Sequence, residues 1–306
     1  MDNIISQMVI LLLIVIAGFI SNKCGLMGGE FDRKLANFII NVSCPCLVLS
    51  SVMGDEFPDR GMILPLLLVG TLTYVILFAL CYYLPRLFVK DPETRGLYSF
   101  MLMFANVGFI GYPVVAAVFG SKAVFYAALL NMPNALFIFV VGTVFVLGTG
   151  SKLRFDYRTL YCPALIASYI AIIIVAVGWD SMPHVITEPF RFLGNITVPG
   201  ALLIIGSSMA HMDLSHFLGS RRSYIMSAFR LILIPVALFF LFRACGVSST
   251  VNEINTVVIG MPVASYGTMF CLKYGRDETE MVQGTLITTI LSVFTIPLLT
   301  LLFRFA

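Results

Sequence analysis

The sequence predicts an all-α integral membrane protein with ten transmembrane helices in two inverted five-helix repeats. Three observations lead to this fold class. First, 59% of the 306 residues are hydrophobic and 11% are charged, whereas charged residues make up about a quarter of a soluble globular domain. Second, apolar segments of spanning length follow one another along the whole chain. Third, one segment in each half is interrupted by glycine and proline, as in the inverted repeats of secondary transporters.

Each apolar segment of about 20 residues is long enough to cross the hydrocarbon layer. The expected spans are residues 4–20, 34–52, 62–84, 97–119, 123–148, 161–178, 189–210, 223–245, 251–272 and 281–303. The short loops between them leave no room for a soluble catalytic or DNA-binding domain. Because the net charge is only +3, a lipid bilayer is the expected partner and nucleic acid is not.

Lysine and arginine are unevenly distributed between the two sets of loops. The odd-numbered loops carry 13 of the 19, the even-numbered loops and the C-terminus carry 5, and Arg230 lies inside a span. Cytoplasmic loops are the ones enriched in these residues. We therefore expect a multi-pass protein of the cell (inner) membrane with both termini outside, as an even number of spans requires them to share a side.

The longest basic loop divides the chain into two sets of five spans. We expect a first repeat over residues 1–148, a cytoplasmic linker over 149–160 and a second repeat over 161–306. Because five is an odd number, the second repeat must insert upside down relative to the first.

Two short motifs recur at a nearly constant offset in the two halves. The pattern Asn, β-branched residue, hydroxyl residue, any residue, Pro occurs at 41–45 and at 195–199, an offset of 154. An aromatic residue followed by glycine occurs at 119–120 and at 274–275, an offset of 155, and each glycine is expected to end a helix. These matches favour the inverted repeat.

The fourth and ninth spans are each expected to contain a break. Pro113 cannot donate the helical hydrogen bond and its ring clashes with the preceding turn, and it is expected to push Tyr112 out of the α region. Pro262 breaks the ninth span in the same way. Because an unpaired backbone group in hydrocarbon costs several kcal/mol, such breaks occur inside protein or beside a water-filled cavity. Paired breaks therefore indicate a substrate site. The candidate substrate-binding residues at the breaks are Asn106, Gly108, Gly111, Tyr112, Pro113, Gly260, Met261 and Pro262.

The motifs at and after the breaks occur in a defined order. They are Asn106-x-Gly108-x-x-Gly111-x-Pro113, Phe119-Gly120, Met261-Pro262, Lys273-Tyr274-Gly275-x-Asp277 and Leu291-Ser292-x-x-Thr295-Ile296-Pro297-Leu298. Together they resemble the auxin efflux carrier family in its short bacterial form, over essentially the whole chain. The long central cytoplasmic loop of many plant carriers is missing, which favours a bacterial-type permease.

This resemblance carries expectations about fold and activity. It implies ten spans in two inverted repeats, helices four and nine that cross at their breaks near the bilayer midplane, and transport of small organic anions such as dicarboxylates or, in plants, auxin. A more distant resemblance to the fold of sodium-coupled bile acid symporters supplies the alternative, a sodium- or proton-coupled organic anion symporter.

The residue types at the breaks suit an anion. A half-helix that starts after a break presents unpaired N–H groups and the positive end of its dipole, which favours a carboxylate. Asn106 can donate from its amide to the anion, or it only caps the half-helix. Gly108 and Gly111 let a ligand approach closely, or they allow tight helix packing.

Three further polar residues are candidates. Asn41 and Asn195, near the hydroxyls of Ser43 and Thr197, lie one turn before prolines in the repeat-related spans. These four side chains either take up the carbonyls that the prolines leave free or contact the ligand. Arg230 lies inside a span, where a cation is a functional hypothesis by default. It either attracts anions or gates the pathway, or its long side chain snorkels to the headgroups.

We therefore expect a secondary carrier or facilitator that moves a small mono- or dicarboxylate by alternating access. The cation-coupled symporter is the alternative, and a channel or sensor stays open. An enzyme is not expected, because the sequence lacks paired intramembrane Asp residues and a His-Glu-x-x-His motif. No cofactor is expected, and no metal, since the thiols of Cys44 and Cys46 without a nearby His are too few ligands. The sequence leaves monomer and homodimer open.

Overall fold

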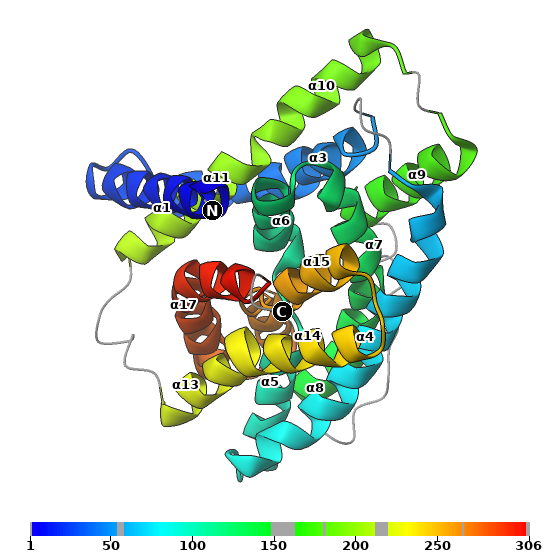
Figure 1. The fold of residues 1–306 in the computed structure, drawn as a ribbon. Helices are drawn as coiled ribbons and strands as arrows, with labels where there is room; N and C mark the ends of the chain where they lie inside the picture. Colours follow the sequence, from blue (N-terminus) through cyan, green and yellow to red (C-terminus); the bar gives the residue numbers. More distant parts are fainter. Residues whose placement is uncertain are drawn as a thin grey trace. The chain divides into compact units, whose positions relative to one another are not determined.

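The structure is a computed structural model that describes residues 2–53, 58–147, 163–179, 182–211, 220–264 and 266–303. Over these residues the chain is helical, as Figure 1 shows, and its β-interaction is one isolated antiparallel bridge between Ala105 and Val263. The predicted all-α class is confirmed for the described part of the chain.

The α-helices follow the expected spans closely. In chain order they are α1 (Asp2–Lys23), α2 (Gly29–Phe38), α3 (Cys44–Ser50), α4 (Ile63–Tyr83), α5 (Pro92–Met103), α6 (Tyr112–Phe119), α7 (Lys122–Phe137), α8 (Thr143–Leu147), α9 (Pro163–Val177), α10 (His184–Asn195), α11 (Thr197–His211), α13 (Arg221–Ala228), α14 (Ile234–Ala244), α15 (Ser249–Ile259), α16 (Tyr266–Lys273) and α17 (Thr279–Leu302). Wider π-helical turns join some of them: η1 (Ile39–Ser43), η4 (Val107–Gly111), η5 (Ile138–Gly142) and η7 (Phe229–Leu233). Two 3₁₀ turns, η2 (Arg60–Met62) and η3 (Leu84–Leu87), flank α4.

Several continuous helical stretches have the length and composition of membrane spans. Within the described residues these are Arg60–Leu87, His184–Ser207, Arg221–Ala244 and Thr279–Leu302. Shorter apolar helices cover Leu13–Lys23, Val107–Phe119 and Leu165–Val177. These helices indicate a multi-pass membrane protein. The total of ten spans stays a prediction.

Three of the π-helical turns end two residues before a proline. Pro45, Pro113 and Pro235 each lie in the first turn of the α-helix that follows η1, η4 and η7. A proline ring clashes with the carbonyl four residues earlier and offers no N–H to it. A wider turn with bonds to the fifth residue moves that carbonyl away, so the helix continues past the proline.

The wide turn η4 shows that one prediction about the fourth span is wrong. Tyr112 is the first residue of α6, so the expectation that Pro113 pushes it out of the α region is wrong. The break lies earlier, after Met103 ends α5, where Phe104 adopts the extended φ of −102° and ψ of 122°. In the ninth span the break follows Ile259 and contains Pro262, as expected.

The two predicted glycine helix ends are confirmed. Gly120 follows α6 with φ +87°, and Gly275 lies just after α16 with φ +65°. Both values lie in the left-handed region, which glycine adopts without steric cost. Each aromatic-glycine pair therefore marks the end of a half-helix.

The chain forms two compact units, each assembled from both halves of the sequence. Unit 1 comprises Met1–Leu67, Gly108–Met132 and Leu160–Met212. Unit 2 comprises Leu68–Val107, Pro133–Thr159 and Asp213–Ala306. The division into two repeats is a different division of the chain, and it stays a prediction.

In unit 1, α1 packs against α11, and α9 and α10 pack against α3 (Figure 1). The first contact brings backbones together. A Cβ added to Gly18 would lie 2.2 Å from the carbonyl oxygen of Leu203, and one added to Gly206 would lie 1.9 Å from that of Val15. Small residues at such positions let membrane helices approach closely, so these two glycines fix the α1–α11 contact.

In unit 2, α5 lies at the centre of an aromatic and aliphatic core. Phe100 stands 4.9 Å from Phe104 and 5.9 Å from Phe270 between ring centroids. Gly96 allows α5 to touch α8, since a Cβ there would lie 2.0 Å from the carbonyl oxygen of Phe145. Around this core, α13 packs against α17 and α14 against α15. Unit 2 thus holds both breaks within a packed interior.

Candidate functional site

The two breaks pair with each other inside unit 2. The N–H of Asn106 donates to the carbonyl of Pro262 at 2.8 Å, and the N–H of Ala264 donates to the carbonyl of Phe104 at 3.0 Å. These bonds flank the antiparallel bridge between Ala105 and Val263. A broken helix in a membrane must satisfy its freed backbone groups within the protein, and each break here does so with the other.

A threonine on α17 satisfies another backbone group in the second break. The N–H of Val263 donates to the hydroxyl of Thr288 at 3.1 Å, and that hydroxyl donates to the carbonyl of Gly284 at 2.8 Å. Thr288 is fully buried. Sequence analysis missed this residue, since a single threonine in an apolar span carries no periodic signal.

Arg230 joins both breaks from η7. Its guanidinium is fully buried, Nη1 donates to the carbonyl of Leu102 at 2.8 Å, and Nε donates to the carbonyl of Met261 at 3.2 Å. The helical donor for Leu102 would be the N–H of Asn106, which bonds to the other break instead. The snorkelling alternative for Arg230 is wrong, because the side chain points into the protein interior.

Asn106 lies between the bridge and the turn η4. Asn106 is half-buried and directly precedes Val107, the first residue of η4. That position fits either expected role, a cap for the following helical turn or a ligand contact. Of the second break, Gly260, Met261 and Pro262 are all buried. The structure thus brings together Asn106 with the three candidate residues of the ninth span.

The remaining candidates of the fourth span belong to unit 1. Gly111, Tyr112 and Pro113 are buried, and Gly108 is half-buried. The thiol of Cys44 donates to the carbonyl of Gly108 at 3.2 Å. This contact could not be predicted from the sequence alone. A Cβ added to Gly108 would have no heavy atom within 4 Å. Its backbone is helical, so neither packing nor φ requires a glycine there.

Asn41 and Asn195 are both exposed in unit 1. The amide of Asn41 donates to the carbonyl of Asn37 at 2.8 Å. Their hydroxyl neighbours are buried instead: Ser43 donates to the carbonyl of Leu193 at 2.6 Å and lies 2.6 Å from the hydroxyl of Thr197. The hydroxyls therefore join the second and seventh spans, and Ser43 serves a carbonyl of the partner helix.

A second polar cluster in unit 2 joins the middle of α5 to the beginnings of α13 and α17. The phenol of Tyr98 on α5 donates to Oε2 of Glu280 on α17 at 2.5 Å. It also lies 3.2 Å from the hydroxyl of Ser220 and 3.3 Å from that of Ser223, at the start of α13. Glu280 is thus bonded to a buried phenol.

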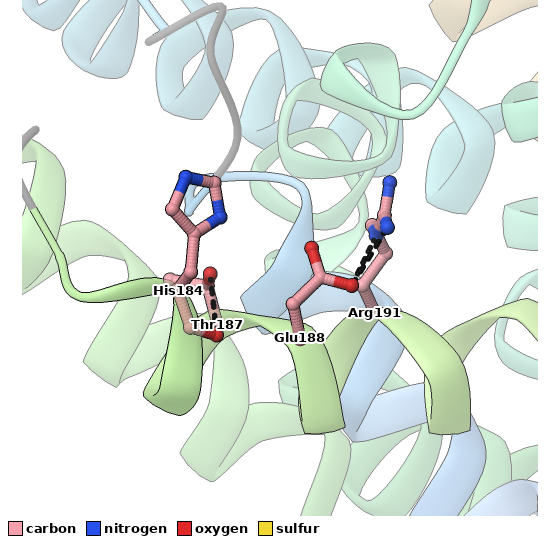
Figure 2. A network of polar contacts seen from close by, with 4 residues as sticks. All are labelled: His184, Thr187, Glu188 and Arg191. Atoms are coloured by element: carbon pink, nitrogen blue, oxygen red, sulfur yellow. Dashed lines mark hydrogen bonds and ion pairs between the residues drawn. The ribbon is translucent and has the colours of Figure 1, made fainter.

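Two polar contacts on α10 join residues one turn apart, as Figure 2 shows. The hydroxyl of Thr187 bonds to the carbonyl of His184 at 3.4 Å, and Arg191 pairs with Glu188 at 2.6 Å. An exposed ion pair of this spacing contributes about 0.3–0.5 kcal/mol. Among the described residues no group of three or more His, Cys, Asp or Glu side chains comes together.

Comparison with known proteins agrees with this architecture. A model of the membrane transport protein family matches residues 3–300. An uncharacterised transporter of Methanocaldococcus jannaschii is 25% identical over 307 residues, covering 94% of this chain and 95% of the relative. An uncharacterised transporter of Methanothermobacter thermautotrophicus is 24% identical over 297 residues, covering 94% of each chain.

The match extends over nearly the whole chain and includes both breaks. It confirms the resemblance inferred from the order of the glycine and proline motifs. The chain belongs to the membrane transport protein family, the family of auxin-efflux-carrier-like permeases.

Proposed function

We propose that this protein is a secondary carrier that moves a small organic anion, a mono- or dicarboxylate, across the cell membrane by alternating access. The observation that carries the proposal is the pairing of the two breaks through the bridge between Ala105 and Val263. Interrupted helices that meet are the usual site of substrate binding in secondary transporters.

The chemistry of the breaks supports an anion. The half-helices α6 and α16 begin after the breaks, and the first N–H groups of a helix carry a partial positive charge. Asn106 adds an amide that donates a hydrogen bond to a carboxylate. The proposed contacts in unit 2 are Asn106, Gly260, Met261 and Pro262. In unit 1, Gly108, Gly111, Tyr112 and Pro113 stay candidates from the sequence. Asn41 and Asn195, which are both exposed in unit 1, also stay candidates from the sequence.

The inverted repeat belongs to the same proposal. Ser43 and Thr197 are separated by 154 positions, the offset of the repeated Asn-Pro motif, and they bond to each other. Residues related by a two-fold axis touch when they lie on that axis. The repeat pairs the first span with the sixth and the second span with the seventh. The contact of α1 (first span) with α11 (seventh span) therefore corresponds to the contact of α9 (sixth span) with α3 (second span). These contacts support the repeat.

Coupling to a cation is the second candidate, favoured by two buried amide oxygens in unit 2. Oδ1 of Asn134 and Oδ1 of Asn252 have no hydrogen-bond partner among the described residues. Buried polar atoms without partners are rare and call for an explanation such as an ion. Oxygen ligands of this kind suit a hard cation such as Na⁺.

Transport by the purified protein in proteoliposomes tests the proposal. We expect uptake of labelled acetate, succinate, malate or indole-3-acetate, accelerated when the vesicles contain the same unlabelled anion. A channel gives no such acceleration. Replacing external Na⁺ by K⁺, and comparing pH 6 with pH 7.5, separates a facilitator from a cation-coupled symporter. If none of these carboxylates is bound or transported, the proposed substrate class is wrong.

A further inference from the structure

Arg230 is a cation buried in unit 2, and it has no acidic partner among the described residues. The ion pairs of the described residues are Lys34 with Glu30 and Arg191 with Glu188, and Arg230 takes part in neither. The titratable side chains that act on it are Tyr74 and Cys81, a phenol and a thiol that are ordinarily neutral at pH 7. Among the described residues, its charge is therefore balanced by something other than a carboxylate.

The backbone ends of two helices provide that balance. Nη1 of Arg230 bonds to Leu102 in the last turn of α5, and Nε bonds to Met261, two residues after α15 ends. The C-terminal end of a helix carries about half a negative elementary charge. Two such ends at one guanidinium offset about one positive charge.

The same dipoles determine how the crossing acts on a substrate. Within unit 2 the breaks bring together the C-terminal ends of α5 and α15 and the N-terminal ends of η4 and α16. Two negative and two positive helix ends nearly cancel one another. With the guanidinium present about one positive charge remains, which attracts an anion.

One nitrogen of the guanidinium stays available. Nη2 of Arg230 is buried and has no hydrogen-bond partner among the described residues. A buried charged donor without a partner is costly, and such a group in a native structure calls for an explanation such as a bound water, ion or ligand. Guanidinium N–H groups match the planar oxygens of a carboxylate.

We propose that Arg230 determines the charge selectivity of transport: it supplies the net positive charge at the paired breaks, and its Nη2 donates to the carboxylate of the substrate. This inference rests on the proposed function, since it concerns the residue that recognises the charge of the transported anion. The guanidinium thus has two roles, to cap the breaks through Nε and Nη1 and to hold the anion through Nη2.

The test compares Arg230→Gln and Arg230→Lys with the wild type, and Arg243→Gln is the matched control. Arg243 lies in the same span, at the exposed end of α14. Binding of acetate, succinate, malate and indole-3-acetate to each purified full-length protein is measured beside that of the uncharged amides acetamide and succinamide.

We expect Arg230→Gln to weaken the binding of every carboxylate that the wild type binds by about ten- to a hundredfold. The same variant should bind the amides as tightly as the wild type or more tightly. Arg230→Lys keeps the charge but loses the planar donors, so its carboxylate affinity should lie between those of the wild type and Arg230→Gln. Arg243→Gln should match the wild type.

A second measurement separates charge recognition from loss of structure. Cysteines at positions 105 and 263 report whether the two breaks still pair, through the yield of the disulfide between them in the wild-type and Arg230→Gln backgrounds. An equal loss of carboxylate and amide binding together with a lost disulfide makes Arg230 a structural clamp and overturns the proposal. Unchanged carboxylate binding by Arg230→Gln overturns it as well. A wild type that binds none of the four carboxylates refutes the proposed function instead.

Discussion

Substitution of Asn106 separates a substrate contact from a helix cap. Aspartate keeps the shape and acceptor capacity of asparagine, but it places a negative charge where the carboxylate of the substrate must lie. Alanine removes only the side-chain hydrogen bond. The bridge between the breaks uses the backbone N–H of Asn106, which donates to Pro262 at 2.8 Å, so both variants keep that bond.

The two roles predict opposite orders of affinity. Two like unit charges about 4 Å apart at an effective dielectric constant near 20 repel by about 4 kcal/mol, roughly a thousandfold in affinity. Loss of one hydrogen bond to an ion costs about 1.5–3 kcal/mol. A substrate contact therefore predicts the order wild type, Asn106→Ala, Asn106→Asp. A capping residue predicts that Asn106→Asp resembles the wild type and Asn106→Ala is worse, because aspartate caps as well as asparagine.

The assay is carboxylate affinity of the three purified proteins at pH 5 and pH 7.5, with monodispersity checked for each. If Asn106 contacts the substrate, the Asn106→Asp protein should regain affinity at the lower pH, where the new carboxyl takes up a proton and the repulsion falls. Tighter binding by Asn106→Asp than by Asn106→Ala at pH 7.5 would remove Asn106 from the substrate site.

Three further predictions test the architecture. Ala105→Cys with Val263→Cys, in a background free of native cysteines, should form a disulfide, because a non-hydrogen-bonded antiparallel pair has Cα atoms about 4.5 Å apart; persistent free thiols under oxidation would contradict the bridge. Gly108→Ala should weaken carboxylate uptake but leave the melting temperature unchanged or raise it, since alanine is favoured over glycine in a helix by about 1 kcal/mol. Gly206→Ala should instead destabilise the protein by about 1–3 kcal/mol, because the added methyl group overpacks the α1–α11 contact. Equal melting temperatures of the two variants would contradict this difference. A reporter at the C-terminus should be active outside the cell, and cytoplasmic activity would contradict the proposed orientation.

Much of the helical architecture could be predicted because its signals are local. Hydrophobic segments of spanning length produce helices wherever a bilayer is the solvent, and α4, α9 and α17 lie close to the ranges that hydropathy predicts. Gly120 and Gly275 end helices because glycine alone tolerates positive φ at no cost. The break near Pro262 follows from the missing N–H of proline. The family resemblance rests on the same local residues.

The position of the first break depended on more than proline chemistry. Pro113 lies in a continuous helix, because the wide turn η4 accommodates its ring. The chain leaves the helix at Phe104 instead, where the pairing of Asn106 with Pro262 replaces the helical hydrogen bond. The strand propensity of phenylalanine is too weak by itself to end a helix at Phe104. The partner segment, more than 150 residues away, determines it.

Sequence alone thus determined the class of protein, the helix ranges, the second break and the family, since each follows from residues adjacent in the chain. Tertiary structure decided which segments meet. Hydropathy places Arg230 inside a span, but it does not tell whether the side chain reaches the headgroups or the protein interior. That depends on the carbonyls of Leu102 and Met261, which two distant breaks leave free. A buried charge is stable only where such partners converge, and their convergence is a property of the packed helices rather than of any one segment.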